Sequence, residues 1–217
     1  KATVGGDFYW LHKNEKGEVY FAVIDCTGHG VPGALLSMTV SSLLNHLIKD
    51  IGMDKPSAIL QTMHQEFGAA LHQENPEAQQ DGVEISFLKI TKGLITFCGA
   101  GLNLVYYDKQ SQTLNQIRGD RYGLGGLKRH LELELTEHNL PCSANLLLYL
   151  YTDGIIDQPV PDAEKIKRLG NVLWLKLISE LVSLPLSEQK TLLAEKVKAM
   201  LDFYEQRDDI TIVGLQL

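Results

Sequence analysis

The sequence predicts an α+β fold in a single domain, residues 1–217. The predicted elements run as strands, two helices, many strands, two helices and one strand, without regular βαβ alternation. No internal repeat, low-complexity tract or Pro/Ser-rich linker divides the chain. The composition, 44% hydrophobic and 22% charged, is ordinary for a globular domain. We therefore expect sheets packed together, with helices outside them.

The N-terminal half is predicted to contain a strand, a turn and two helices. Residues 19–24 (VYFAVI) form a short apolar run, which is typical of a buried strand. The run ends at Asp25, and a glycine-rich turn, residues 26–30, follows it. Residues 31–49 carry apolar side chains at helical spacing, with a proline in the first turn, where its missing N–H costs nothing. Residues 56–73 predict a second amphipathic helix.

The rest of the chain is predicted to supply most of the strands. Residues 83–90 alternate apolar and polar side chains, as a half-buried strand does. Residues 146–151 (LLLYLY) form a continuous apolar run, which predicts a central strand, and an acidic turn, residues 152–154, follows it. Further strands are predicted at 94–98, 103–107, 131–135 and 210–217, and helices at about 165–184 and 187–204.

Charge and cysteine content exclude several classes of protein. The formal net charge is −7 and the pI is near 5.5, which argues against a nucleic-acid binder. The three cysteines are odd in number and form no CxxC spacing, so we expect neither a disulfide framework nor a structural zinc site. We expect a reducing cytosolic compartment instead. No apolar run reaches the ~18 residues of a membrane-spanning helix. The chain starts at Lys1 without Met, which we interpret as a cut inside a longer protein.

Four aspartates lie at predicted strand edges or in tight turns. They are Asp7, Asp25, Asp153 and Asp208. Carboxylates at the ends of neighbouring strands can converge, and they repel one another unless a cation neutralises them. Carboxylate, carbonyl and water ligands suit Mg²⁺ or Mn²⁺. Two such ions ~4 Å apart can hold a water between them and lower its pKa, so that the bridging hydroxide attacks phosphorus directly.

Each of these aspartates also has a simpler interpretation. A single Asp in a turn commonly caps local N–H groups, and TDG and DD are ordinary turn sequences. Spacing alone does not show that the four side chains meet in space. The prediction of a metal centre therefore depends on the four acting together.

Four motifs that contain these aspartates occur in order along nearly the whole chain. They are Gly5-Gly6-Asp7-Phe8-Tyr9, Asp25-Cys26-Thr27-Gly28-His29-Gly30-Val31-Pro32-Gly33-Ala34, Tyr151-Thr152-Asp153-Gly154-Ile155 and Asp208-Asp209-Ile210-Thr211, with a weaker match at Phe97-Cys98-Gly99-Ala100-Gly101-Leu102-Asn103. With these motifs the sequence resembles the SpoIIE-type (RsbU-type) branch of the metal-dependent PPM protein phosphatases. Any one motif is moderately specific, and the assignment depends on their order.

The resemblance implies an α/β/β/α sandwich, in which helices flank two mostly antiparallel sheets, and two Mn²⁺ or Mg²⁺ ions at one end. By matching positions, Asp25 would bridge both ions, Asp7 would bind one of them, and Asp153 the other. Asp208 would be the final ligand, and Asp209 a neighbour that orients it.

Two residues of the glycine-rich turn have roles implied by the resemblance. The backbone carbonyl of Cys26 would be an additional metal ligand. His29 could protonate the leaving serine oxygen, as a histidine does in some relatives, or could hydrogen-bond only within its loop. The candidate catalytic residues are thus Asp7, Asp25 and His29.

The resemblance also implies a function and a setting. Family members dephosphorylate serine or threonine, in bacteria often on small STAS-type regulatory proteins whose partner choice then switches. We expect the catalytic domain to lie at the C-terminus, behind an upstream sensor domain. We also expect it to lie in the cytoplasm, with a membrane anchor or a homodimer formed through upstream segments as open possibilities.

Three alternatives compete with this interpretation. Residues 28–33 (GHGVPG) match G-x-G-x-x-G between a strand and a helix, as in a dinucleotide-binding fold, although Asp25 would repel the pyrophosphate. The chain could also be a non-catalytic PPM-fold binding module, but that predicts missing metal ligands, and all four aspartates are present. A kinase-like transferase gains no support, because neither a phosphate-binding G-x-x-x-x-G-K-[ST] loop nor a His-Arg-Asp loop occurs.

Overall fold

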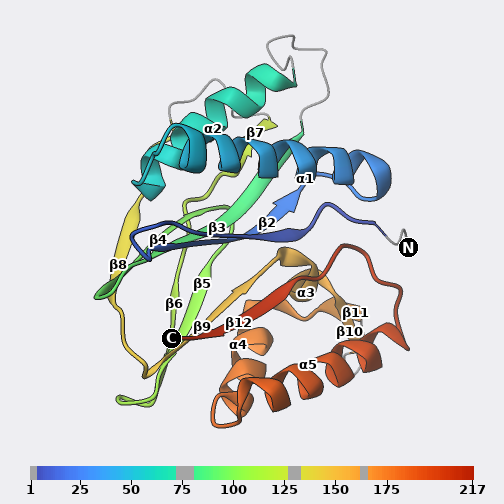
Figure 1. Cartoon of the computed structure of the whole chain (residues 1–217). Helices are drawn as coiled ribbons and strands as arrows, with labels where there is room; N and C mark the ends of the chain where they lie inside the picture. The colour runs from blue at the N-terminus through green and yellow to red at the C-terminus, as the bar shows by residue number, and fades with distance from the viewer. Residues whose placement is uncertain (1–3, 72–80, 127–132, 162–165) are drawn as a thin grey trace.

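Two β-sheets face each other in the structure, and helices cover their outer faces (Figure 1). This computed structural model describes residues 4–71, 81–126, 133–161 and 166–217. One outer layer consists of α1 (Gly30–Asn45) and α2 (Pro56–Ala70), and the other of α4 (Gly170–Leu181) and α5 (Leu186–Leu201). The layers therefore follow the order α/β/β/α, which confirms the predicted α+β sandwich.

The two sheets differ in size. The larger contains β1 (Phe8–Lys13), β2 (Val19–Cys26), β3 (Gly82–Ile90), β4 (Leu94–Ala100) and β8 (Glu137–Pro141) in that spatial order, with β7 (Leu124–Gly125) paired to β3. The smaller contains β12 (Ile212–Gln216), β9 (Leu146–Tyr151), β5 (Leu104–Asp108) and β6 (Thr113–Ile117). All of these named strand pairs are antiparallel. A short helix, α3 (Asp153–Asp157), follows β9, and β10 (Pro159–Pro161) pairs with β11 (Ile166–Arg168).

The two most apolar runs of the sequence are inner strands. β2 lies between β1 and β3, and its residues 20–24 are buried. β9 lies between β12 and β5, and all six of its residues are buried. A strand with neighbours on both edges and packed layers on both faces has no solvated side, so its side chains need not alternate.

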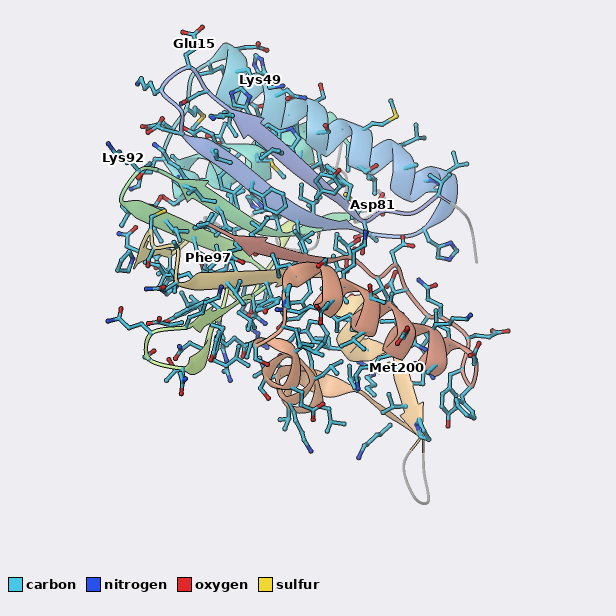
Figure 2. All side chains as sticks on the ribbon, turned by 60° about the horizontal axis from the view of Figure 1, so that its bottom comes forward. Glu15, Lys49, Asp81, Lys92, Phe97 and Met200 are labelled. Atoms are coloured by element: carbon cyan, nitrogen blue, oxygen red, sulfur yellow. The ribbon has the colours of Figure 1, made fainter. Side chains whose placement is uncertain are left out.

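The space between the sheets is filled by large apolar side chains. Phe21 and Phe97 from the larger sheet pack there with Leu148 and Leu150 from β9, and Phe97 is labelled in the interior in Figure 2. Separate apolar clusters lie under α1 and α2 and under α4 and α5. This packing fixes the strand ends of one sheet relative to those of the other, which is what places the candidate site.

Some predicted elements are wrong. In the predicted strand 131–135, residues 131–132 lie outside the described part of the chain and 133–135 are not in a strand; the strand of this region is β8. The sequence did not indicate β6 or β8, because these half-exposed strands (TLNQI and EHNLP) are too polar for a periodic apolar pattern. The helix predicted from residue 165 begins only at Gly170, because residues 166–168 pair with β10 as β11.

One helical stretch has the length and composition to cross a membrane. It covers Gly30–Asp50, that is α1 and the π-helical turn η1 (His46–Asp50), with a mean hydropathy of 1.3. A single such helix is weak evidence, because an apolar helix that packs on a core passes the same test. Here Leu36, Val40 and Leu44 of α1 are buried in the cluster under the helices.

Candidate metal centre

The four predicted aspartates come from two sheets. Asp7 precedes β1 and Asp25 lies near the end of β2, both belonging to the larger sheet. Asp153 is the first residue of α3, directly after β9, and Asp208 lies in the segment that leads into β12, so both belong to the smaller sheet. The centre is therefore assembled across the sandwich and not within one sheet.

Thr152 connects Asp7 to the smaller sheet. Its hydroxyl donates a hydrogen bond of 2.6 Å to Oδ2 of Asp7 and accepts one of 3.0 Å from the backbone N–H of Thr211. The backbone N–H of Thr152 donates to the carbonyl of Thr211 at 3.1 Å. Because Thr152 is fully buried, these bonds hold the two strand ends together without competition from water.

Asp25 is the centre of the constellation. Asp7 and Asp153 lie close enough to it for their charges to act on its carboxyl group. Burial, followed by the charges of Asp7, Asp153 and Asp208, raises the pKa of Asp25 to about 9. Burial also raises the pKa values of Asp7 and Asp153. A carboxyl group with such a pKa holds a proton at neutral pH unless a cation takes the place of that proton.

The donor set fits a hard divalent cation. Carboxylate oxygens are the ligands that Mg²⁺ and Mn²⁺ prefer, and Oδ1 of Asp7 is buried without a hydrogen-bond partner. Within the described ranges, however, no three His, Cys, Asp or Glu side chains already have the arrangement of a metal site. Binding of a cation would therefore require these side chains to turn their oxygens toward it.

The two acids of the last motif have different surroundings. Asp208 faces the same cleft as Asp25 and Asp153, and its charge raises the pKa of both. Asp209 accepts a hydrogen bond of 2.8 Å at Oδ2 from the backbone N–H of Gly6, so it fixes the turn before Asp7. The structure thus brings Asp208 to the carboxyl cluster and Asp209 to the glycine turn, and their roles as ligand and orienting neighbour remain predictions.

Cys26 and His29, both in the glycine-rich turn, differ in burial. The Cys26 side chain is buried under the helices, and burial raises the pKa of its thiol to about 12, which leaves only the backbone carbonyl as a candidate ligand. A Cβ on Gly6 would collide with that carbonyl, so only glycine fits there. His29 precedes α1 and is exposed, and it does not line the cleft that contains Asp25. Its role as a general acid remains a prediction.

Glu84 is a fifth carboxyl group of the site, and the sequence did not indicate it. Glu84 lies on β3 directly opposite Asp25, and burial, followed by the charge of Asp153, raises its pKa. A Cβ on Gly101, whose φ is +83°, would lie 2.6 Å from Cδ of Glu84, so this glycine leaves room for the side chain. The pairing of Glu84 with Asp25 follows from the register between β2 and β3, which the sequence alone does not show.

All but one of the five carboxyl groups open into a cleft of about 450 Å³; Asp7 is not among the residues that line it. Its walls include the acidic residues Asp25, Glu84, Asp153 and Asp208 and the basic residue Arg121. A larger cavity of about 830 Å³ lies between α5 and β12, but its walls are mostly apolar and contain none of the four predicted aspartates. The smaller cleft is therefore the candidate active site.

Fold and site together define a class: the PP2C-type protein serine/threonine phosphatases. The family model described as "Stage II sporulation protein E (SpoIIE)" matches residues 15–217. The chain therefore belongs to the SpoIIE family, as the motifs predicted. A sequence search among curated proteins gives no match.

Several solved structures share the fold of this chain. The SiaA-PP2C domain of Pseudomonas aeruginosa is 26% identical, with a TM-score of 0.82 over 99% of this chain and 81% of that one. The RsbU and RsbW domains of a Mycobacterium tuberculosis protein give 17% identity and a TM-score of 0.70 over 100% and 56%. RsbX in complex with magnesium gives 18% identity and a TM-score of 0.65 over 100% and 89%. The antiparallel sheets leave no support for the dinucleotide-binding alternative, which requires a doubly wound parallel sheet.

Proposed function

We propose that this chain removes phosphate from phosphoserine or phosphothreonine on a regulatory protein, using Mg²⁺ or Mn²⁺ held by Asp7, Asp25, Asp153 and Asp208. One observation carries the proposal: carboxyl groups from both sheets meet at Asp25, whose pKa rises to about 9. Such a cluster is unfavourable as it stands and becomes favourable when divalent ions neutralise it. We expect two ions, with Asp25 shared between them.

The residues around Asp25 have distinct proposed roles. The Thr152 hydroxyl fixes Oδ2 of Asp7, which leaves the buried Oδ1 of Asp7 for a cation. Asp209 holds Gly6 through its backbone N–H, and Gly6 packs closely against the Cys26 carbonyl, the proposed additional ligand. Bound divalent ions would supply a water of lowered pKa and neutralise the charge of the phosphate. His29, on the exposed turn, is the proposed donor of the proton to the leaving serine oxygen.

The substrate class is proposed from the family. A small STAS-type protein phosphorylated on serine or threonine would present its phosphate on a surface loop, which an open cleft of about 450 Å³ can admit. One neighbour in fold joins an RsbU and an RsbW domain in a single chain, and another belongs to the bacterial stressosome. We propose that this chain, acting as one catalytic domain in the cytoplasm, likewise serves a partner-switching system. An upstream sensor, which could also dimerise the protein, would control it.

Hydrolysis of para-nitrophenyl phosphate and of a phosphoserine peptide tests the proposed activity. We expect the wild type to be active with Mn²⁺ or Mg²⁺, and EDTA to abolish the activity. Asp25→Ala should reduce kcat by at least about 10³-fold, because it removes the shared carboxylate on which the charge balance depends. Activity that survives both EDTA and Asp25→Ala would contradict the proposal. A folded, metal-loaded wild type without activity would instead favour a non-catalytic binding module.

A further inference from the structure

Arg121 is the one basic residue among the described residues that line the carboxylate cleft. The cleft also contains Asp25, Glu84, Asp153 and Asp208. The Arg121 side chain is exposed, and its guanidinium carbon lies 5.4 Å from the centre of the Tyr122 ring, in a cation–π contact. Although acidic groups surround it, no salt bridge to Arg121 is found in the described part of the chain. Its hydrogen-bond donors are therefore available to a ligand in the cleft.

The backbone on the N-terminal side of Arg121 is fixed by β4. The N–H of Asp120 donates to the carbonyl of Gly99 at 2.8 Å, and the carbonyl of Asp120 accepts from the N–H of Gly101 at 2.9 Å. The Asp120 carboxylate accepts a hydrogen bond of 2.7 Å from the backbone N–H of Thr136. Arg121 thus directly follows a residue that is held by both its backbone and its side chain.

The backbone on the C-terminal side is fixed by β3 and α2. Leu124 and Gly125 form β7 and pair with Val83 and Gly82. The N–H of Gly125 also donates a hydrogen bond of 2.9 Å to Nδ1 of His64, a buried residue of α2. Only residues 121–123 lie between the two anchored segments. The backbone of Arg121 is therefore held in place close to the carboxylates.

A phosphoryl group needs a cation with hydrogen-bond donors at this place. A phosphate ester is a dianion, and the carboxylates of the cleft repel it wherever bound metal ions do not neutralise them. Guanidinium groups bind phosphate oxygens through two parallel hydrogen bonds, and contact with an aromatic ring restricts their orientation in advance. Because the backbone at Arg121 is fixed, only the freedom of its side chain is lost on binding.

We propose that Arg121 binds the phosphoryl oxygens of the substrate and thereby selects phosphate esters. The proposal rests on the phosphatase function proposed above and names the residue that recognises the group to be cleaved. Arg121 then acts in substrate binding, while the carboxylates hold the metal ions. The alternative is a solvated surface arginine, and Arg118 offers the comparison, because it is also exposed, lies three residues away and does not line the cleft.

Two measurements with Mn²⁺ present test the proposal: calorimetric binding of inorganic phosphate and steady-state hydrolysis of para-nitrophenyl phosphate. For Arg121→Ala we expect the Kd of phosphate and the KM to rise about tenfold or more, while kcat changes less than about threefold. Arg121→Lys should fall between wild type and Arg121→Ala, because it keeps the charge but loses the two parallel hydrogen bonds. Arg118→Ala should match the wild type, and all variants should bind Mn²⁺ as the wild type does.

The outcomes separate this proposal from the proposed function. Phosphate binding by Arg121→Ala within twofold of the wild type overturns the role of Arg121, and wild-type hydrolysis would then keep the phosphatase function intact. Equal weakening by Arg121→Ala and Arg118→Ala also overturns it, because the effect would be one of overall charge. A wild type that binds phosphate through Arg121 but hydrolyses nothing would support the phosphate site and contradict the phosphatase function.

Discussion

Asp25 shows most directly how burial and charge act on a single residue. Its carboxyl group lies among those of Asp7, Asp153 and Asp208, with Glu84 opposite it on β3. Its pKa rises from 3.8 to about 9. Between these two values the folded protein keeps a proton that the unfolded chain has lost. The free energy of unfolding therefore falls as the pH rises through this window, unless a cation replaces the proton.

The pH dependence of stability tests this account of Asp25. In EDTA, we expect the free energy of unfolding of the wild type, measured by urea denaturation, to decrease between pH 5 and pH 9 relative to that of Asp25→Asn. The asparagine keeps the size of the side chain and removes the titration, so the difference between the two profiles reports Asp25. Saturating Mn²⁺ should abolish the decrease in the wild type. Parallel profiles for the two proteins in EDTA would contradict the assigned pKa shift.

Individual residues of the site differ in how far the sequence reveals them. Asp25 and Asp153 could be predicted, because each follows the apolar run of an inner strand. Glu84 and Arg121 could not be predicted, since they reach the site through strand register and through a loop anchored at both ends. Thr152 stood within a predicted motif, but its hydrogen bond to Asp7 joins residues 145 positions apart. The sequence therefore predicts ligands on local grounds and leaves out those that depend on pairing between distant segments.

At the scale of elements, glycines allow segments to approach at the site. Gly154 is the second residue of α3, directly after Asp153, and a Cβ there would collide with the backbone oxygen of Asp209. This close contact keeps the segment that contains Asp208 beside α3. The glycine of the Thr-Asp-Gly motif is thus required by close packing as well as by the turn.

Gly154→Ala tests whether this contact positions the site. We expect a loss of about 1–3 kcal/mol in the free energy of unfolding, as overpacking of a close contact typically costs. Mn²⁺-dependent hydrolysis should fall as well, because Asp208 moves with Asp209. Gly93→Ala is the matched control, since no heavy atom lies within 4 Å of a Cβ at that position, and its stability should stay within about 0.5 kcal/mol of the wild type. Equal effects of the two substitutions would contradict the proposed positioning role.

Helices and strands, like single residues, can be predicted where a local sequence pattern marks them and not where they depend on pairing between distant segments. β2, β9 and the helices α1, α2 and α5 follow long apolar or periodic runs, and the sequence predicts them closely. β6 is an edge strand of its sheet, and its polar side chains carry no such pattern. β11 exists through pairing with β10, which overrides the helical interpretation of residues 166–168.

At the scale of the whole molecule, the centre connects the two halves of the sandwich. Asp7 and Asp25 belong to the larger sheet, and Asp153 and Asp208 to the smaller. Ions bound by all four would cross-link the sheets, whereas the carboxylates alone repel one another across the same boundary. Any ligand that binds only the folded state stabilises it by mass action, so divalent ions should stabilise the protein as a whole.

A calorimetric titration with Mn²⁺ at neutral pH, together with thermal unfolding of the same samples, tests the central claim most directly. We expect the wild type to bind Mn²⁺, to release protons as it does so, and to unfold at a higher temperature with Mn²⁺ than with EDTA. Asp25→Asn should bind Mn²⁺ at least about tenfold more weakly and lose most of the increase in Tm. Wild-type protein that binds no Mn²⁺, or binds it equally well without the Asp25 carboxylate, would contradict a metal centre assembled around Asp25.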